Sequence, residues 1–165
     1  MKPSVVFFED QYLPIVVRCV IEAKKEILVA VYEWGWYEGQ ASGTIQDLNR
    51  TLCTVVIKGM KCRAILHNEG PGRTLGRMNR RAAAHLRRAG VDVRMGRTNK
   101  PVHAKLWVFD RERAIVCTHN ISRRAVTCNA ELGVLLEGDG EAARVADYFE
   151  GLWERFGLGL GESQA

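Results

Sequence analysis

The sequence predicts an α/β fold, in which a mixed β-sheet has helices on both of its faces. Apolar segments of strand length alternate with amphipathic segments of helical periodicity over the first 95 residues. Residues 27–32, ILVAVY, are apolar on both faces of a strand, which is typical of a central strand covered on two sides. Three more strand-like segments then follow one another before a last helix, and this order indicates strands of both directions in one sheet.

The first three elements are a strand, a helix and a strand. Residues 5–8 form a short apolar run that ends at two acidic residues. Apolar residues then recur at helical spacing over 11–25, and Pro14 is tolerated because the first turn of a helix leaves its N–H groups without partners. The central strand is expected at 26–32.

Two further helices, each followed by a strand, continue this pattern. The helices are expected at 44–58 and 73–89, and the strands at 61–67 and 91–95. Either Ser42 or Thr44 supplies the capping hydroxyl of the first helix. His67, at the carboxyl end of its strand, is either a neighbour of a functional site or simply a polar strand end.

The last third of the chain contains three strands and one helix. The strands are expected at 102–109, 114–117 and 131–136, and the helix at 141–156. The segment 121–129 is expected to be a loop or a short turn. With 165 residues the chain has the length of one domain, which we assign to 1–156, and the Gly-rich segment 157–165 is expected to be a flexible tail.

The composition is that of a soluble globular protein, with 47% hydrophobic and 26% charged residues. The formal charge of +5 favours an anionic partner, either nucleic acid or a phospholipid surface. No segment is long and apolar enough to cross a bilayer, and the start of the chain lacks a signal sequence, so we expect a cytoplasmic protein. The five cysteines form no C-x-x-C pair and are expected to be reduced thiols.

A histidine and a lysine in the strand at 102–109 define the candidate site. His103 and Lys105 are two residues apart, so in a strand they share one face. An imidazole is able to attack phosphorus or to protonate a leaving oxygen, and an ammonium group neutralises the anionic oxygens of a phosphate. The charged turn that follows should bring Thr118 and Asn120 back beside His103, where each donates a hydrogen bond to a phosphoryl oxygen.

These residues resemble a known signature. The pattern His103-x-Lys105-x4-Asp110, with Asn120 ten residues further on, is similar to the signature H-x-K-x4-D-x6-G-S-x-N of the phospholipase D superfamily. The resemblance implies a phospholipase D-like fold and a covalent phosphohistidine on His103. It also implies phosphate contacts from Lys105 and Asn120, and a supporting role for Asp110.

Two further details belong to this resemblance. Asn129-Ala-Glu131 matches an Asn-x-Glu sequence that many superfamily members carry, and it implies that Glu131 hydrogen-bonds the nucleophilic histidine. Cys117 and Thr118 stand where the family has Gly-Ser. Thr118 keeps the hydroxyl, whereas Cys117 adds a Cβ atom and an oxidisable thiol.

The chain has one copy of the motif, although the reaction requires an attacking group and an acid on opposite sides of phosphorus. A two-fold homodimer solves this, because it brings the same patch of each subunit together. His103 of one subunit would attack while His103 of the partner subunit protonates the leaving oxygen. Lys105, Asn120 and Thr118 of both subunits would hold the phosphate oxygens, and Glu131 would orient the imidazole. The scheme needs no metal and no cofactor, because lysines supply the positive charge.

Basic and aromatic residues indicate which class of substrate contains the phosphate. The helix at 73–89 contains no acidic residue. It carries six arginines, which indicate repeated phosphate contacts or else form a merely solvated face; they are Arg73, Arg77, Arg80, Arg81, Arg87 and Arg88. Arg97 and Lys100 in the next loop are additional candidates. Trp34 and Trp36 either stack on bases at the mouth of the site or form the small core of their own loop.

The first hypothesis for the function is therefore a metal-independent endonuclease that acts on DNA or RNA. A phospholipid hydrolase or phosphatidyl transferase of the same chemistry is the second reading. A nucleic-acid-binding module without catalytic activity is the third, and the Cys117-Thr118 departure is its only support.

Overall fold

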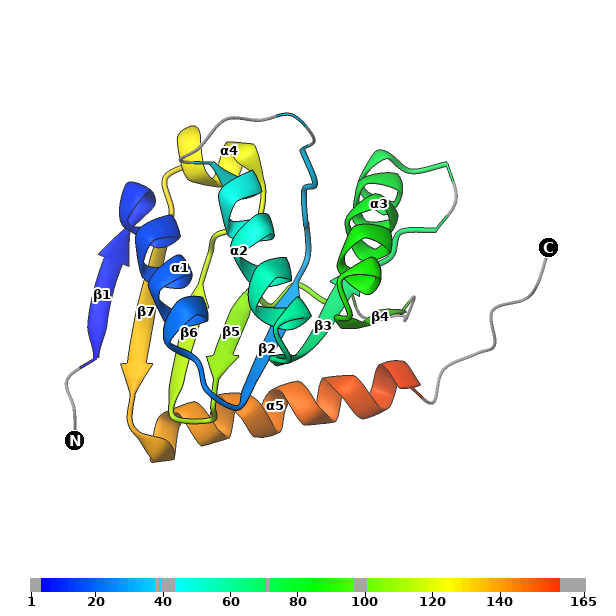
Figure 1. Ribbon diagram of the computed structural model, residues 1–165. Helices are drawn as coiled ribbons and strands as arrows, with labels where there is room; N and C mark the ends of the chain where they lie inside the picture. Colours follow the sequence, from blue (N-terminus) through cyan, green and yellow to red (C-terminus); the bar gives the residue numbers. More distant parts are fainter. Residues whose placement is uncertain (1–3, 38, 40–43, 71, 97–100, 158–165) are drawn as a thin grey trace.

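A seven-stranded mixed β-sheet organises the computed structural model, which describes residues 4–37, 39, 44–70, 72–96 and 101–157 (Figure 1). The strands lie in the order β1-β7-β6-β5-β2-β3-β4. Their bounds are β1 Val5–Phe8, β2 Glu26–Val31, β3 Lys61–His67, β4 Asp92–Gly96, β5 Leu106–Phe109, β6 Arg113–Cys117 and β7 Leu132–Glu137. Strands β2, β3 and β4 are parallel, whereas the pairs from β2 through β5, β6 and β7 to β1 are all antiparallel.

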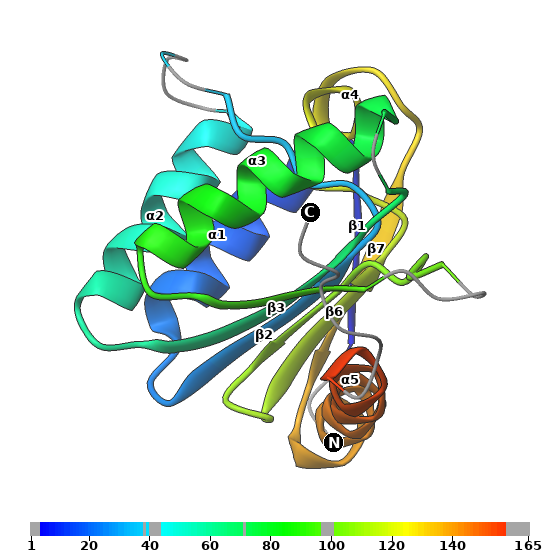
Figure 2. The same ribbon diagram turned by 90° about the vertical axis from the view of Figure 1, so that its right-hand side faces the viewer.

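Helices cover both faces of the sheet, as the sequence predicted. Helices α1, α2 and α3 pack on one face and α5 crosses the other, as the two views show (Figures 1 and 2). The helices are α1 Tyr12–Glu22, α2 Ile45–Ile57, α3 Thr74–Arg88, the short α4 Arg123–Thr127 and α5 Asp139–Gly157, and a 3-10 turn, η1, spans Glu9–Gln11. Within the described ranges, no helix combines the length and the apolar composition that crossing a bilayer requires.

Strand β2 lies at the centre of the core. Its residues Ile27, Val29 and Val31 pack under the helices of one face, and Leu28 and Ala30 pack against the α5 face. This alternation explains why the segment is apolar throughout, because both faces of a central strand are buried. The sequence-based prediction for this strand is confirmed.

Two local predictions differ from the structure. Strand β5 begins only at Leu106, so His103 and Lys105 precede the strand instead of lying in it. The Lys105 Nζ donates to the His103 carbonyl oxygen at 2.8 Å, and this side-chain bond occupies an acceptor that a strand would use for its ladder. The segment 121–129, expected as a loop, contains helix α4. The tail was predicted at 157–165, but Gly157 still belongs to α5, and 158–165 lie outside the described residues.

Asp110 performs a structural role at the far end of β5 from Lys105, about 16 Å along the strand. Its carboxylate accepts hydrogen bonds from the backbone N–H groups of Lys24 at 2.8 Å, Lys25 at 2.6 Å and Glu26 at 3.0 Å. It therefore fixes the start of β2 to the β5–β6 turn. The structure does not bring Asp110 into the candidate site, contrary to the supporting catalytic role that the motif implied.

We expect Asp110 to make the stability of the fold depend on acid pH. Burial by itself would raise the pKa of Asp110, but the backbone N–H groups of Glu26, Lys24 and Lys25, together with Arg113, hold this pKa below its usual value. A carboxyl group with a lowered pKa in the folded state stabilises the fold above the unfolded-state pKa of about 3.9, and this contribution is lost as the pH falls through the folded-state value.

The Asp110→Asn variant tests this role. It should lower the free energy of unfolding at pH 7 by about 1–2 kcal/mol, because one acceptor oxygen and the charge are lost. Urea titrations at several pH values should show a smaller difference between variant and wild type below about pH 4. An unchanged difference from pH 7 to pH 3 would contradict the assignment.

Candidate functional site

The candidate site lies at one end of the sheet, where five chain segments converge. Because β5 runs antiparallel to β2, the start of β5 meets the carboxyl end of β2, and Leu106 pairs with Ala30. On its other side Leu106 pairs with Val116 near the end of β6. The segments that precede β5 and β7 and follow β2, β3 and β6 therefore share this edge. They carry most of the residues that the sequence analysis assigned to catalysis.

His103 and Lys105 lie in direct contact. The Lys105 Nζ is 3.2 Å from Nδ1 and 3.4 Å from Nε2 of His103. The His103 side chain is exposed and Lys105 is half-buried. Burial lowers the pKa of Lys105, while the nearby Cys117 and Glu131 oppose this effect. An exposed imidazole with an ammonium group beside it has the chemistry to bind an anion and to supply a nucleophile.

Thr118, Glu131 and Asn129 form a second group. The Thr118 hydroxyl donates a hydrogen bond to the Glu131 carboxylate, and Asn129 Nδ2 donates to Glu131 Oε1 at 3.0 Å. Among the described residues, Thr118 and Asn129 are the hydrogen-bonding side chains of Glu131, and no bond joins Glu131 to His103. The direct contact that the resemblance implied is therefore not made in this structure. Glu131 instead acts on Thr118 and, electrostatically, on Lys105.

Successive side chains after β6 point alternately towards the site and into the core. Thr118 is exposed and Asn120 half-buried at the site, whereas His119 between them is fully buried and stacks on Tyr12, with ring centroids 4.3 Å apart. Asn120 Oδ1 accepts a hydrogen bond from the Glu33 backbone N–H at 3.2 Å. This bond ties the motif to the end of β2 and leaves the Asn120 amide nitrogen to donate to a phosphoryl oxygen.

Cys117, which stands where the family has glycine, is half-buried, and its thiol lies against two backbone carbonyl groups. Its Sγ lies 3.8 Å from the Lys105 carbonyl oxygen and 3.7 Å from the His119 carbonyl oxygen. Burial raises the pKa of Cys117 to about 12, so the thiol stays protonated at neutral pH and is a poor nucleophile. In the part of the chain that the structure describes, no three His, Cys, Asp or Glu side chains gather into a possible metal site.

The two tryptophans proposed for base stacking pack against other side chains of the protein, although Trp36 is only half-buried. Trp34 is fully buried, and its Nε1 donates to Asn49 Oδ1 at 2.8 Å. Trp36 stacks on His85, with ring centroids 4.2 Å apart. A base has no access to Trp34, and one face of Trp36 is already covered, so these rings form the loop's own core, as the alternative reading held.

The arginines of α3 lie on the surface. All six side chains are exposed along Thr74–Arg88 and the residue before it. Arg80 is partly tied to the protein, because it donates to Asn68 Oδ1 at 3.3 Å and to the Gly70 carbonyl oxygen at 3.2 Å. Arg87 likewise donates to the Val93 carbonyl oxygen at 2.8 Å. The other proposed phosphate contacts, Arg97 and Lys100, lie outside the described residues.

Three side chains that were not assigned to the site lie beside it. The Tyr32 ring contacts His103, with centroids 5.1 Å apart, and it also stacks on His67. The Tyr32 hydroxyl donates to Glu69 Oε1 at 3.2 Å. Tyr32 and His67 follow adjacent positions of the parallel strands β2 and β3, where Val31 pairs with Leu66. The positions of both residues at carboxyl strand ends were visible in the sequence, but the contact of Tyr32 with His103 was not.

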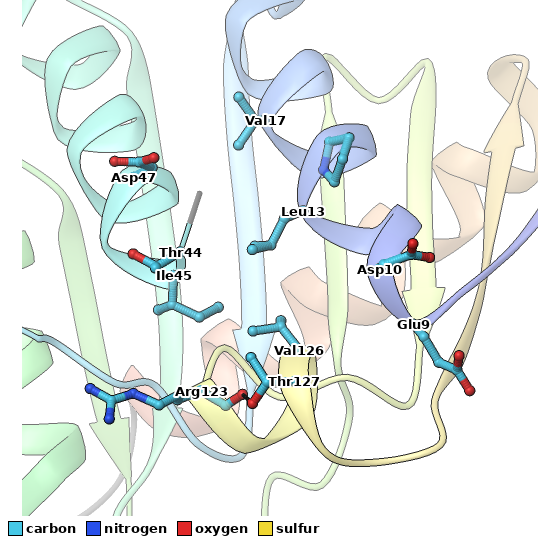
Figure 3. A pocket seen from close by; sticks show the side chains of 11 residues that line it. Glu9, Asp10, Leu13, Val17, Thr44, Ile45, Asp47, Arg123, Val126 and Thr127 are labelled. Carbon is cyan, nitrogen blue, oxygen red and sulfur yellow. Dashed lines mark hydrogen bonds between the residues drawn. The ribbon is translucent and has the colours of Figure 1, made fainter. Parts of the chain in front are cut away.

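A cleft of about 450 Å³ opens beside His103 and Lys105. Its walls include Val116 and Tyr148, whose side chains are 45% and 55% exposed. A larger cavity of about 760 Å³ lies elsewhere, between α1, α2 and α4 (Figure 3). Apolar side chains including Leu13, Val17 and Ile45 line the larger cavity, but none of the predicted catalytic residues does.

Comparisons with known proteins agree with this geometry. The family model described as "Cardiolipin synthase, PLD-like domain" matches residues 16–153. Nuc, a phospholipase D family member from Salmonella typhimurium, has a similar structure, with a TM-score of 0.76 at 16% identity over 92% of this chain and 94% of Nuc. NucT from Helicobacter pylori gives a TM-score of 0.75 at 16% identity over 92% of this chain and 96% of NucT.

Two larger proteins contain a similar unit. The archaeal chromatin protein TrmBL2, whose structure shows a novel mode of DNA binding, gives a TM-score of 0.60 at 16% identity over 94% of this chain and 53% of TrmBL2. Phosphatidylserine synthase from Haemophilus influenzae gives 0.66 at 12% identity over 93% of this chain and 38% of the synthase. No curated protein sequence matches the chain. The family match covers most of the chain, and the fold agrees, so this protein belongs to the PLD-like domain family of the phospholipase D superfamily.

Proposed function

We propose that this protein is a metal-independent endonuclease that hydrolyses phosphodiester bonds of DNA or RNA through a phosphohistidine at His103. The contact between the His103 ring and the Lys105 ammonium group carries this proposal. It places a nucleophile beside a fixed positive charge at an exposed position, which is what attack on an anionic phosphate requires. The lengths and folds of Nuc and NucT, which closely match this chain, support a compact single-motif enzyme.

Each step of the reaction has a group to carry it out in a two-fold dimer. A ring nitrogen of His103 attacks phosphorus, the bond to the leaving oxygen breaks, and His103 of the partner subunit protonates that oxygen. The same partner histidine then takes a proton from water, and the water oxygen attacks phosphorus and breaks the P–N bond. Lys105 and Asn120 of both subunits stabilise the charge on the phosphoryl oxygens throughout.

An exposed apolar patch next to the site supports the homodimer. It consists of Val6, Phe8, Val116, Leu132 and Tyr148, all between 45% and 56% exposed. The strand residues share the sheet face that α5 partly covers, because Val116 pairs with the α5-facing Leu106, and the pairs Val6–Val134 and Phe8–Leu132 continue across the sheet. Val116 and Tyr148 also line the cleft beside His103. A second subunit that covers this patch would bring its own His103 towards the first.

The arginine surface of α3 supports nucleic acid as the substrate. The Arg77→Ala/Arg81→Ala double variant should weaken binding to all sequences to a similar extent. It should also reduce the slope of log K against log salt by about 2, because each phosphate contact releases about one counterion. Fluorescence anisotropy with a labelled oligonucleotide at several salt concentrations measures this slope. Arg18→Ala on α1, an exposed arginine on another helix, is the matched control and should leave the slope unchanged.

The deciding experiment is a cleavage assay in excess EDTA with single-stranded and duplex DNA and RNA. Cleavage that persists in EDTA supports the proposal. Salt-sensitive binding without cleavage would overturn it in favour of a binding module, a reading that the similarity to the DNA-binding TrmBL2 keeps open.

A phospholipid substrate is the second candidate, because the matching family model carries the description cardiolipin synthase and phosphatidylserine synthase has a similar domain. Vesicles that contain phosphatidylglycerol provide the test. Release or transfer of a phosphatidyl group with no cleavage of nucleic acid would establish this second function in place of the first.

A further inference from the structure

The Tyr32 ring touches both members of the His103–Lys105 pair. Its centroid lies 5.1 Å from the His103 ring centroid, with the planes tilted by 54°, and 5.7 Å from the Lys105 Nζ. The reaction scheme above uses neither Tyr32 nor its neighbours His67 and Glu69. A rigid ring in contact with a nucleophile restricts the directions in which that nucleophile points.

Two side chains contact the side chain of Tyr32, and a third side chain fixes its backbone. His67 stacks on it, with centroids 4.9 Å apart and an interplanar angle of 15°. Glu69 accepts a hydrogen bond from its hydroxyl. The fully buried Asn79 of α3 donates from Nδ2 to the carbonyl oxygens of Tyr32 at 2.8 Å and His67 at 2.7 Å, which locks the two strand ends together.

His67 is suited to a supporting role beside a cationic site. Its side chain is 8% exposed, and its Nδ1 is buried without a hydrogen-bond partner among the described residues. Burial lowers the pKa of His67, and the nearby His103 lowers it further, while Glu69 opposes both effects. The lowered pKa favours the neutral form of His67, which packs on Tyr32 without adding a positive charge next to the His103–Lys105 pair.

We propose that Tyr32 is a positioning residue, which orients the His103 imidazole for attack and holds the Lys105 ammonium group beside it. The inference rests on the proposed function, since it assigns a role in the same reaction. It adds to that function a supporting group formed by Tyr32, His67, Glu69 and Asn79. This group holds the catalytic pair in place before substrate binds. A shift of the nucleophile by about 1 Å is enough to slow a reaction about 100-fold, so loss of the ring should act on the chemical step.

The Tyr32→Leu variant tests the ring, with bis(4-nitrophenyl) phosphate as a small substrate that does not reach the α3 arginines. We expect kcat to fall about 10- to 100-fold while KM changes less than about threefold, because the defect lies in orientation and not in binding. Tyr32→Phe keeps the ring and should retain kcat within about fivefold. This rescue by phenylalanine separates positioning from a general loss of structure.

A double-mutant cycle tests the link to Glu69 without disturbing the core. Tyr32→Phe and Glu69→Ala each remove the same hydrogen bond, so the double variant should lose no more activity than either single variant. NMR gives a readout that does not depend on activity. The imidazole C–H signals of His103 should carry a ring-current shift that Tyr32→Phe retains and Tyr32→Leu abolishes.

The outcomes distinguish this inference from the proposed function. Wild-type kcat in Tyr32→Leu would overturn the positioning role, and additive effects of Tyr32→Phe and Glu69→Ala would overturn the part that Glu69 plays in it. Either result leaves the proposed nuclease intact. Should Tyr32→Leu fail to fold, the cycle and the His103 ring-current shift in the wild type still decide. Full activity of a His103→Ala variant would instead remove the proposed function itself.

Discussion

Replacement of His103 by alanine is expected to lower phosphodiesterase activity at least about 1,000-fold, because it would remove both the nucleophile and the acid of the proposed composite site. The fold should be unaffected, since the His103 side chain is exposed and precedes β5. Initial rates on a fluorogenic oligonucleotide in EDTA, together with thermal melting curves, measure the two effects. Lys61→Ala, at an exposed position at the start of β3 and the opposite end of the sheet, is the control and should keep wild-type activity.

Mixed dimers make this prediction more specific. If wild-type and His103→Ala chains reassort freely in equal amounts, only about a quarter of the dimers contain two His103 side chains. A composite site then gives about half the activity of the same amount of wild-type protein alone. Independent sites in each subunit would leave that activity unchanged, which would contradict the proposed sharing of two histidines across one phosphorus.

The Val116→Asp substitution is expected to break the proposed dimer and to abolish activity together. In the proposed two-fold dimer the substitution would lie in the interface twice, and each carboxylate would lose its hydration there, so we expect dimerisation to weaken at least about 100-fold. Val116 is 45% exposed in the single chain, so Val116→Asp should leave the free subunit folded. Sedimentation velocity over a range of protein concentrations, with activity measured on the same samples, tests the coupling.

Ile21→Asp supplies the matched control for this interface. Ile21 is 60% exposed on α1, on the other side of the sheet from the apolar patch, so the same change of chemistry there should alter neither dimerisation nor activity. A Val116→Asp variant that is monomeric and still fully active would show that a single subunit completes the reaction. In that case the second histidine is not the acid.

Features that depend on neighbours in the sequence were predicted well. The order of strands and helices, the doubly buried central strand and the helices on both faces all follow from local hydrophobic periodicity. The contact of His103 with Lys105 follows from their separation by two residues, although they precede the strand instead of lying in it. Motif spacing alone was enough to indicate the superfamily, because the motif residues all belong to or flank a single hairpin, β5–β6.

Other features depend on which strands pair, and only the tertiary structure decided them. Asp110 belongs to the motif, yet it follows the end of β5 opposite to Lys105, and the antiparallel pairing of β2 with β5 sets it against the start of β2. Trp34 follows the same strand that delivers Tyr32, but it turns into the core. The sequence by itself determined which chemical groups the candidate site contains. The pairing of strands that are distant in the sequence determined which residues surround those groups. Contacts such as that of Tyr32 with His103, 71 residues apart, arise from the register of strands that no local pattern encodes.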